Sequence, residues 1–320
     1  MINIIAGGAG FIGINLIKKL SAQNSQIYIL DNLSNSSKKE LNNLIKLSNI
    51  HFIKCDLSIQ SDLNSILKKI CENNNCDITL WHLAANSNIP GGINNPEIDL
   101  KDTFQTTFCL VEACKKFRIK NFIFASSSAI YGNHGDLTIK EDTGPLIPIS
   151  NYGAMKLASE AVCFAAYESH LQNLRIYRFP NVVGIPPTHG VILDLVNKLK
   201  INPKVMQVLG DGFQEKSYLH VEDLINGMIL LNKVNLKSND NPIFNLGLKN
   251  DTVKINWLAE EVIKQFSPGA KAIYGKRDRG WDGDVPKFKY DTSKAISYGW
   301  EPQLNSKEAV SKAINQIINY

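Results

Sequence analysis

Two residues of this sequence, Tyr152 and Lys156, have the spacing of an acid–base pair. They are four positions apart, so on a helix both side chains lie on the same face. An unperturbed tyrosine has a pKa of about 10, which is too high for an effective base near neutral pH. A neighbouring ammonium group favours the phenolate and lowers that pKa. The same spacing also occurs between ordinary neighbours on a helix surface.

Serine hydroxyls supply a second candidate reacting group. Ser126, Ser127 and Ser128 follow the apolar run Phe122–Ala125, which is typical of a buried strand. A hydroxyl at this strand end could bond a substrate hydroxyl and relay its proton to Tyr152. For two of the three serines we expect a simpler role, in which the hydroxyl bonds backbone groups of the loop.

An alternating framework must position these residues. Six short apolar runs are typical of buried strands: Ile2–Ala6, Ile27–Leu30, His51–Lys54, Ile78–Leu83, Phe122–Ala125 and Leu174–Phe179. Stretches with helical spacing lie between or beside them: Phe11–Leu20, Leu41–Leu47, Leu63–Ile70, Phe104–Phe117 and Tyr152–Tyr167. Apolar strands alternating with helices predict a parallel sheet covered on both faces. With right-handed crossovers this is an α/β, doubly wound fold of the Rossmann type.

A glycine-rich turn joins the first predicted strand to the first predicted helix. A diphosphate needs backbone amides close to it, and glycine leaves that approach open while the helix N-terminus adds partial positive charge. The last glycine of the turn also lets the helix pack closely on the sheet. The strand–turn–helix context predicts a dinucleotide-binding turn. Its predicted cofactor-binding residues are Gly7, Gly10, Phe11, Ile12 and Gly13.

Asp31 ends the second predicted strand and precedes Asn32. A carboxylate there can accept hydrogen bonds from the adenosine ribose and would repel a 2′-phosphate, which favours NAD over NADP. We therefore assign Asp31 and Asn32 to the cofactor. Asp56 and Leu57, after the third strand, are predicted to border its adenine. The alternative for Asp31 is a simple turn or cap residue.

The alternation weakens after about Pro180, where proline and glycine punctuate shorter segments. This change predicts an NAD-binding Rossmann domain over residues 1–180 and a smaller lobe for the substrate, mainly over 181–320. The chain is expected to re-enter the first domain at about 217–246. A last amphipathic helix is predicted near Lys307–Ile318.

The composition is that of a globular enzyme of moderate charge. The chain has 320 residues, is 44% hydrophobic and carries a formal net charge of +5. This charge is too small to indicate nucleic-acid binding, and no stretch is long and apolar enough to cross a bilayer. The cysteines form no metal-binding pattern, and we expect free thiols in a reducing, cytoplasmic compartment. They are Cys55, Cys71, Cys76, Cys109, Cys114 and Cys163.

Seven motifs in order along the chain resemble those of the extended short-chain dehydrogenase/reductases. They lie at residues 7–13, 31–34, 82–85, 126–132, 152–156, 178–184 and 218–224. Within this family the chain is most similar to the nucleotide-sugar epimerases and dehydratases, and among these to the 4-epimerases of UDP-glucose and UDP-glucuronate. The resemblance spans nearly the whole chain.

The resemblance implies roles for individual residues. Ser127 would be the catalytic hydroxyl, Tyr152 the base, and Lys156 both its modulator and a ligand of the nicotinamide ribose. Further cofactor contacts are expected at Leu83, Ala84 and Ala85, and substrate contacts at Asn86, Ser127, Asn181, Lys216 and Arg279. The helices at 104–117 and 152–167 are expected to form a homodimer interface in addition to packing on the sheet.

Three departures from the family pattern refine these expectations. Ser128 and Ala129 stand where the family's dehydratases and decarboxylases carry acidic residues, so no acid is offered for water elimination. The family's Asn-x-x-Gly-Thr is replaced by residues 103–107. Trp281 opens a Trp-Asp-Gly-Asp segment where the family has Arg-Pro-Gly-Asp, so an arginine on the diphosphate must be Arg279 or Arg277, or be absent.

These observations together predict an NAD-dependent 4-epimerase of a nucleoside-diphosphate hexose or uronic acid, with a UDP-sugar favoured. The C4 carbinol would be oxidised to a 4-keto sugar and reduced again from its other face. A dehydratase, decarboxylase or reductase on the same scaffold is the alternative. A non-catalytic nicotinamide-binding regulator is a third class, which the retained Tyr152 and Lys156 disfavour.

Overall fold

The computed structural model describes residues 1–23, 25–72 and 77–320. The prediction of a free thiol at Cys76 lies outside these residues. The described chain divides into two compact units, each built from several segments. The first unit comprises Met1–Ser127, Asn151–Tyr177 and Asn235–Ile243, and the second comprises Ser128–Ser150, Arg178–Val234 and Phe244–Tyr320.

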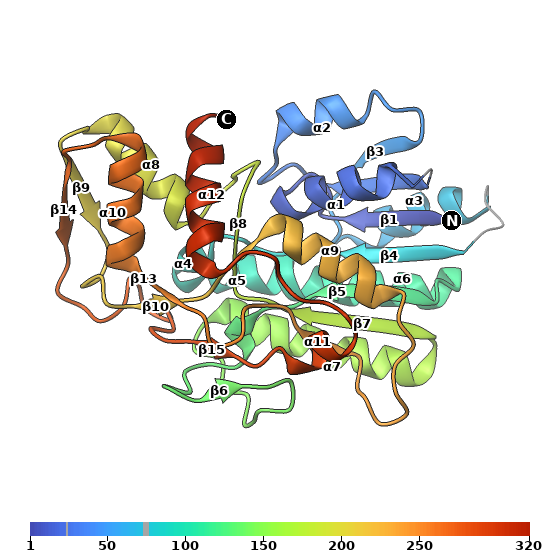
Figure 1. The fold of residues 1–320 in the computed structure, drawn as a ribbon. Helices are drawn as coiled ribbons and strands as arrows, with labels where there is room; N and C mark the ends of the chain where they lie inside the picture. Colours follow the sequence, from blue (N-terminus) through green and yellow to red (C-terminus); the bar gives the residue numbers. More distant parts are fainter. Residues whose placement is uncertain (24, 73–76) are drawn as a thin grey trace. The chain divides into compact units, whose positions relative to one another are not determined.

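A seven-stranded sheet dominates the described part of the chain (Figure 1). Its strands follow the order β12 (Ile243–Asn245), β7 (Asn173–Arg178), β5 (Asn121–Ala125), β4 (Ile78–His82), β1 (Ile2–Ala6), β2 (Gln26–Asp31) and β3 (Ile50–Lys54). The strands from β7 to β3 run parallel to their neighbours. This order reverses direction between β1 and β4, and such a switch point is where doubly wound folds bind ligands. The prediction of an α/β, doubly wound parallel sheet is confirmed.

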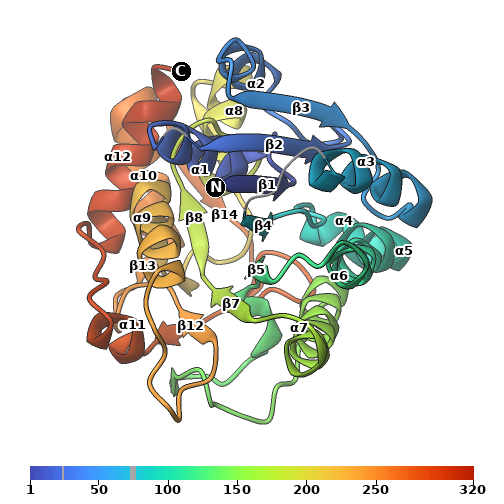
Figure 2. The same cartoon turned by 90° about the vertical axis from the view of Figure 1, so that its right-hand side faces the viewer.

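Helices of the first unit cover its sheet strands. They are α1 (Phe11–Ser21), α2 (Lys38–Leu44), α3 (Gln60–Glu72), α4 (Ile89–Asn94), α5 (Pro96–Asp99), α6 (Thr106–Phe117) and α7 (Asn151–Ser169). Figure 2 shows α3, α6 and α7 on one face of the sheet and α1 on the other. A π-helix, η1 (Leu100–Gln105), leads directly into α6. Its wider turn was not predicted from the sequence.

The predicted helices match the observed ones closely, with one shift. The predicted helix Leu41–Leu47 is instead α2, which begins at Lys38 and ends at Leu44. Leu41 and Leu44 are buried, whereas Leu47 is exposed. The apolar run therefore continues past the helix end, which explains the error.

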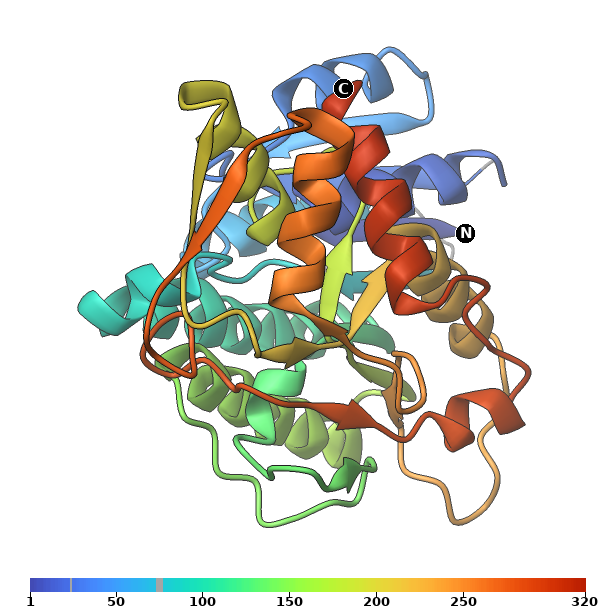
Figure 3. The ribbon, with the colours of Figure 1, turned by 60° about the vertical axis from the view of Figure 1, so that its left-hand side comes forward.

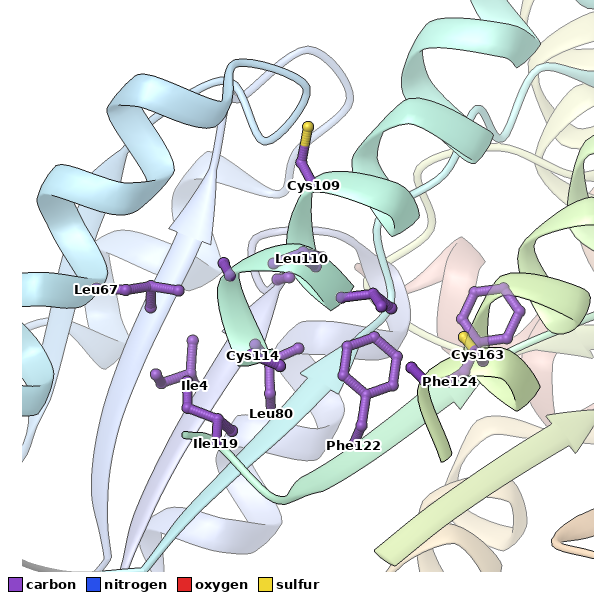
Figure 4. Close-up of a cluster of buried hydrophobic side chains, with 14 of the residues drawn as sticks. Ile4, Leu67, Leu80, Cys109, Leu110, Cys114, Ile119, Phe122, Phe124 and Cys163 are labelled. Carbon is purple, nitrogen blue, oxygen red and sulfur yellow. The ribbon is translucent and has the colours of Figure 1, made fainter. Parts of the chain in front are cut away.

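The core of the first unit lies between the sheet and the helices α3 and α6. Leu67 of α3 and Leu110 of α6 belong to the same buried cluster as Ile4, Leu80 and Phe122, which come from three neighbouring strands (Figure 4). All five side chains are fully buried. Because these strands are apolar on both faces, helices must cover each face, and the carboxyl ends of the strands are the edge left for polar side chains.

The second unit is built from short paired strands and longer helices. The strand pairs are β8 (Asn181–Val183) with β11 (Tyr218–His220), β9 (Val205–Val208) with β14 (Lys271–Tyr274), β10 (Glu215–Lys216) with β13 (Val253–Lys254), and β6 (Thr138–Ile139) with β15 (Lys289–Tyr290). The helices are η2 (Ser128–Ile130), α8 (Val191–Ile201), α9 (Val221–Asn232), α10 (Ile255–Phe266), α11 (Ser293–Ser297) and α12 (Ser306–Ile318).

The second unit has its own hydrophobic core. Leucine, isoleucine and valine side chains of α8, α10 and α12 pack together there. Figure 3 shows α10 and α12 side by side. The predicted last helix, Lys307–Ile318, is confirmed as α12, which an Asn305 capping box starts one residue earlier. Among the helices that the structure describes, none is both long and apolar enough to span a membrane.

Candidate active site

The glycine turn lies at the switch point of the sheet, next to the end of β4. Gly7 has φ +80°, and a Cβ atom built there would lie 2.5 Å from the backbone nitrogen of Ala84. A Cβ atom at Gly13 would lie 2.6 Å from backbone atoms of Gly8. Side chains at positions 7 and 13 would therefore collide with the protein itself. These two glycines close the turn and bring helix α1 onto the sheet.

Gly10 differs from the other two glycines. It is the N-cap residue of α1, no side chain caps the helix, and a Cβ atom at Gly10 would meet only the Gly7 oxygen, at 3.5 Å. Glycine is thus not required there by the protein's own packing. An uncapped helix N-terminus with open space at its first residue suits an approaching phosphate group. The turn fits the diphosphate of a dinucleotide cofactor.

Asp31 is hydrogen-bonded to the backbone of the glycine turn and of the loop that follows β2. Its Oδ2 atom accepts a hydrogen bond from the Ala9 amide at 3.0 Å, and its Oδ1 atom accepts one from the Leu33 amide at 2.8 Å. Burial raises the pKa of Asp31, and these two backbone bonds oppose that effect. Each carboxylate oxygen keeps a further lone pair that can accept a ribose hydroxyl. The predicted cofactor role and the alternative turn role are therefore compatible.

Asp56 and Leu57 follow strand β3, as predicted. Asp56 accepts hydrogen bonds from Ser58 and forms an ion pair with Lys101 at 2.9 Å. Although burial raises its pKa, these bonds outweigh burial and the net shift is downward. Leu57 is buried at 4% exposure. Asp56 is thus held by the protein itself, and its contact with an adenine stays a prediction.

Asn86 closes the loop that follows β4 and the predicted cofactor residues Leu83, Ala84 and Ala85. Its Nδ2 atom donates to the Asn88 carbonyl and to Asp99 Oδ1, and its Oδ1 atom accepts from the Asn88 amide. The Asn86 amide donates to the Thr103 hydroxyl within the π-helix. The side chain therefore fastens its own loop. Its predicted contact with the substrate would use only the remaining lone pair of Oδ1.

Tyr152 and Ser127 are brought together, as the sequence predicts. Tyr152 is the second residue of α7, and its side chain is hydrogen-bonded to that of Ser127. Burial raises the pKa of Tyr152 to about 12, the Ser127 bond lowers it, and the nearby charge of Asp99 raises it. From the protein's own groups the phenol is therefore neutral at physiological pH. Its use as a base requires additional positive charge close to the ring.

Lys156 lies on the same face of α7 and is almost fully buried, at 2% exposure. Its Nζ atom donates to the Ala125 carbonyl at 2.6 Å and lies 5.8 Å from the centre of the Tyr152 ring. Burial lowers the pKa of Lys156 to about 7, and electrostatic interaction with the Cys163 and Glu160 side chains acts in the opposite direction. The ammonium is thus close to the phenol but near its own titration point.

Two further polar groups of this region were not assigned from the sequence. Ser126 donates to the Glu160 carboxylate at 2.5 Å, so the expectation that it bonds loop backbone is incomplete. Glu160 stands eight positions after Tyr152, and this helical spacing could have identified it. His82 is fully buried, and its Nε2 atom lies 2.8 Å from the Thr107 hydroxyl. Its burial and its contact with Thr107 indicate a structural role for His82.

The predicted substrate residues Asn181, Lys216 and Arg279 belong to the second unit. Asn181 is exposed at the start of β8. Lys216 is mostly buried, with its Nζ atom 2.5 Å from Asp284 Oδ1 and also donating to the Val285 carbonyl. Burial lowers the pKa of Lys216, and Asp284 opposes that effect. The lysine is therefore already paired within the protein.

The two candidate arginines are paired as well. Arg277 forms an ion pair with Asp282, and Arg279 forms one with Asp278 at 3.2 Å. Arg277 has 59% of its side chain exposed and Arg279 has 35%. The indole Nε1 atom of Trp281 is buried and has no hydrogen-bond partner in the described part of the chain.

Taken together, these observations define a Rossmann-type protein with a dinucleotide turn and a Ser–Tyr–Lys set at the carboxyl edge of its sheet. The sequence profile described as "NAD dependent epimerase/dehydratase family" matches residues 3–247. The chain belongs to this family. NAD is the cofactor of the family, and the predicted cofactor is thereby confirmed.

Individual relatives are similar along nearly the whole chain. The UDP-glucose 4-epimerase of Lactobacillus helveticus is 27% identical over 96% of this chain and 94% of its own length. The UDP-glucuronate 4-epimerase of Thermodesulfobacterium geofontis is 26% identical over 98% of this chain and 94% of its own. A UDP-glucuronic acid decarboxylase of Danio rerio is 25% identical over 97% of this chain and 71% of its own.

Solved structures share the fold. The UDP-N-acetylglucosamine 4-epimerase of Methanobrevibacter ruminantium M1 has a TM-score of 0.82 and 27% identity, covering 99% of this chain and 98% of its own. The UDP-glucuronic acid 4-epimerase of Bacillus cereus, solved with UDP-glucuronic acid and NAD, has a TM-score of 0.86 and 22% identity, covering 100% of this chain and 99% of its own. The recognition of an epimerase-like family member is confirmed.

Proposed function

We propose that this chain is an NAD-dependent 4-epimerase of a UDP-hexose or UDP-uronate. The observation that carries the proposal is the hydrogen-bonded pair Ser127–Tyr152 with the Lys156 ammonium behind it. This set lies at the carboxyl edge of the sheet that also carries the dinucleotide turn. Such a set can remove and return the hydroxyl proton of a carbinol, and bound NAD would accept and return its hydride, which together are what inversion at C4 requires.

Cofactor binding is proposed for the turn and for Asp31. The backbone at Gly10 and the N-terminus of α1 would receive the diphosphate, and Asp31 would accept the adenosine ribose hydroxyls. Bound NAD would supply the acceptor for the C4 hydrogen and would return that hydrogen to the opposite face of the sugar. The fit of the open Gly10 position supports this assignment.

Ser127 and Tyr152 are proposed to move the proton of the 4-hydroxyl group. The hydroxyl of Ser127 bonds that of Tyr152, so a proton taken from the substrate passes to the phenolate directly or through the serine. A pKa of about 12 leaves the phenol neutral, so the positive charge of Lys156 and of the oxidised cofactor must favour the phenolate. When NAD is bound, the positive charge of its oxidised ring would add to that of Lys156 in favouring the phenolate.

The residues after Ser127 favour epimerisation over elimination. Ser128 and Ala129 form the start of η2 and offer no carboxyl group for removal of water or support of decarboxylation. A dehydratase or decarboxylase remains the alternative function, because a decarboxylase is among the relatives of similar identity.

The second unit is proposed to bind the nucleotide diphosphate through Lys216, with Asn181 and one of the two arginines as further contacts. Lys216 would exchange part of its bond with Asp284 for a phosphate oxygen. A homodimer through α6 and α7 is also proposed. Leu100 and Phe108, at the start of this helical region, are 51% and 42% exposed, which supports an uncovered apolar surface there.

The test is product analysis with the purified protein. UDP-glucose, UDP-glucuronate and their N-acetylated relatives are each incubated with the protein, and products are separated by ion-exchange chromatography and weighed by mass spectrometry. We expect a C4 epimer of unchanged mass from at least one of these sugars. A product lighter by water or carbon dioxide supports the alternative, and no conversion of any sugar contradicts the proposal.

A further inference from the structure

Two oppositely charged side chains of α7 end at consecutive residues of one strand. Lys156 donates from Nζ to the carbonyl of Ala125, at 2.6 Å, and Glu160 accepts from the hydroxyl of Ser126, at 2.5 Å. The two charged residues are one helical turn apart and therefore lie on the same face of α7. Each is only 2% exposed. A cation and an anion are thus buried together at the end of β5.

A buried ammonium group is costly without a counter-charge. On its own helix Lys156 faces Tyr152, Glu160 and Cys163, and from the sheet it faces His82 and the ring of Phe124, whose centre is 4.7 Å from Nζ.

Most of these neighbours are neutral. Burial holds the pKa of the Cys163 thiol well above its usual range and the pKa of His82 well below its own. Burial also raises the pKa of Tyr152 to about 12. Among these neighbours, the Glu160 carboxylate is therefore the counter-charge for the ammonium.

We propose that Glu160 is a positioning residue that keeps Lys156 protonated and clamps the end of β5 beside Ser127. The inference rests on the proposed function, in which Lys156 activates Tyr152. Ser126, held by Glu160, directly precedes Ser127 in the chain, so one carboxylate supports both partners of Tyr152. Glu160 itself touches neither substrate nor cofactor in this account.

The proposed role of Glu160 predicts a change in the pKa of Lys156. Glu160 acts on Lys156 through its charge, one helical turn away, and a nearby opposite charge typically changes a pKa by about 1 to 3 units. Removing the charge of Glu160 while keeping its shape should therefore lower the pKa of Lys156 by an amount in this range. Removing only the hydrogen bond from Ser126 should leave it nearly unchanged.

The experiment is a side-chain NMR titration of ¹⁵N-lysine-labelled protein carrying its cofactor. The Lys156 signal is assigned by its loss in Lys156→Arg. Glu160→Gln is the test, Ser126→Ala the matched control, and Glu160→Asp a variant that retains the charge. We expect the Lys156 pKa to fall by about 1 to 3 pH units in Glu160→Gln and by less than about 0.5 in the other two. An unchanged pKa in a folded Glu160→Gln protein overturns the proposal.

Activity gives an independent second readout. If Lys156 must be protonated, the alkaline limb of the kcat profile shifts to lower pH in Glu160→Gln by the amount seen in the titration, with KM within about twofold. A shift of the alkaline limb to higher pH, or none, overturns the catalytic part of the inference. If the NMR titration moves as expected while no sugar is epimerised, the proposed function fails but the charge pair stands.

Discussion

The proposed reacting groups of the first unit and the basic groups of the second unit are held in different ways. Lys156 is buried and Tyr152 is half-buried beside it, and loss of solvent moves both pKa values toward the neutral forms. Lys216, Arg277 and Arg279 are each paired with an aspartate of their own unit, and the side chains of Arg277 and Arg279 are 59% and 35% exposed.

Groups held in these two ways are suited to two different functions, proton transfer and anion binding. Buried groups with shifted pKa values are suited to proton transfer, because small changes in nearby charge alter their protonation. Paired basic groups are suited to anion binding, because a phosphate can replace a carboxylate oxygen at modest cost. Changes at Tyr152 and Lys156 should therefore act on the rate of the chemical step, and changes at Lys216, Arg277 and Arg279 should act on substrate binding.

Replacement of Tyr152 by Phe should have the largest effect. It removes the only atom by which this residue can take a proton, and it leaves the ring packing of α7 intact. We expect kcat for epimerisation to fall by about 1000-fold or more, with the melting temperature nearly unchanged. The measurement is initial rate of C4 epimer formation. A residual rate within about tenfold of the parent would place the base elsewhere.

The glycine turn allows a matched comparison within the first unit. Ala at position 7 meets backbone at 2.5 Å and a φ of +80°, so Gly7→Ala should destabilise the fold by roughly 2 to 4 kcal/mol in urea unfolding. A methyl group at position 10 would meet no close atom of the protein, but it would occupy space that a bound diphosphate needs.

Gly10→Ala should therefore keep its stability and bind NAD about tenfold or more weakly in calorimetric titration, since a forced close contact costs about 1 to 3 kcal/mol. Equal NAD affinity in Gly10→Ala and the parent would remove the turn from the cofactor site.

The buried lysine predicts a pH dependence of stability. The folded protein holds the Lys156 proton with a pKa of about 7, whereas the ordinary lysine value is 10.5. The unfolded chain thus binds this proton more tightly, so stability should rise as pH increases from 7 toward 10.

The variant Lys156→Met has no ionisable group at this position and therefore lacks this contribution to the pH dependence of stability. Between pH 7 and 9.5 the parent should gain about 2 to 3 kcal/mol of unfolding free energy relative to the variant, measured by urea midpoints at each pH. A difference between the two proteins that does not change with pH would mean that Lys156 is not held near its titration point.

The smallest effects are expected in the second unit. Lys216→Ala should raise the KM for the UDP-sugar by about tenfold and leave kcat within about threefold, since a charge-assisted hydrogen bond contributes about 1.5 to 3 kcal/mol and part of it is already used by Asp284.

One of the variants Arg277→Ala and Arg279→Ala should raise KM, and the other should change KM by less than about threefold, because an exposed ion pair that meets no ligand contributes little. If one of them raises KM as much as Lys216→Ala does, that arginine is the diphosphate ligand. A tenfold loss of kcat in Lys216→Ala would contradict the claim that the basic groups of the second unit act on binding and not on the chemical step.

The sequence predicts the first unit well because its chemistry follows from regular elements. Strands with apolar residues on both faces require a parallel sheet, and their carboxyl ends bring Gly7, Asp31, Ser127 and Tyr152 to one edge. Glu160 was missed because its spacing places it on the same face of the helix as Tyr152 and Lys156 but does not reveal that it is buried.

The second unit was less predictable. Its short strands pair residues that are far apart in the chain, such as Lys271 with Val205. The hydrophobic periodicity of the sequence does not predict which strands pair. The ion pair of Lys216 with Asp284 and the π-helix at Leu100–Gln105 likewise depend on tertiary packing. The basic groups could be named from the sequence, but their partners could not.

The central claim is that the carbinol at C4 is oxidised and reduced in place, without exchange with water. Epimerisation of an active UDP-sugar in deuterated water, followed by NMR of the product, tests it directly. The account predicts a C4 epimer that carries no deuterium at C4. Deuterium incorporated at that carbon would contradict it, because the hydrogen would then have come from solvent.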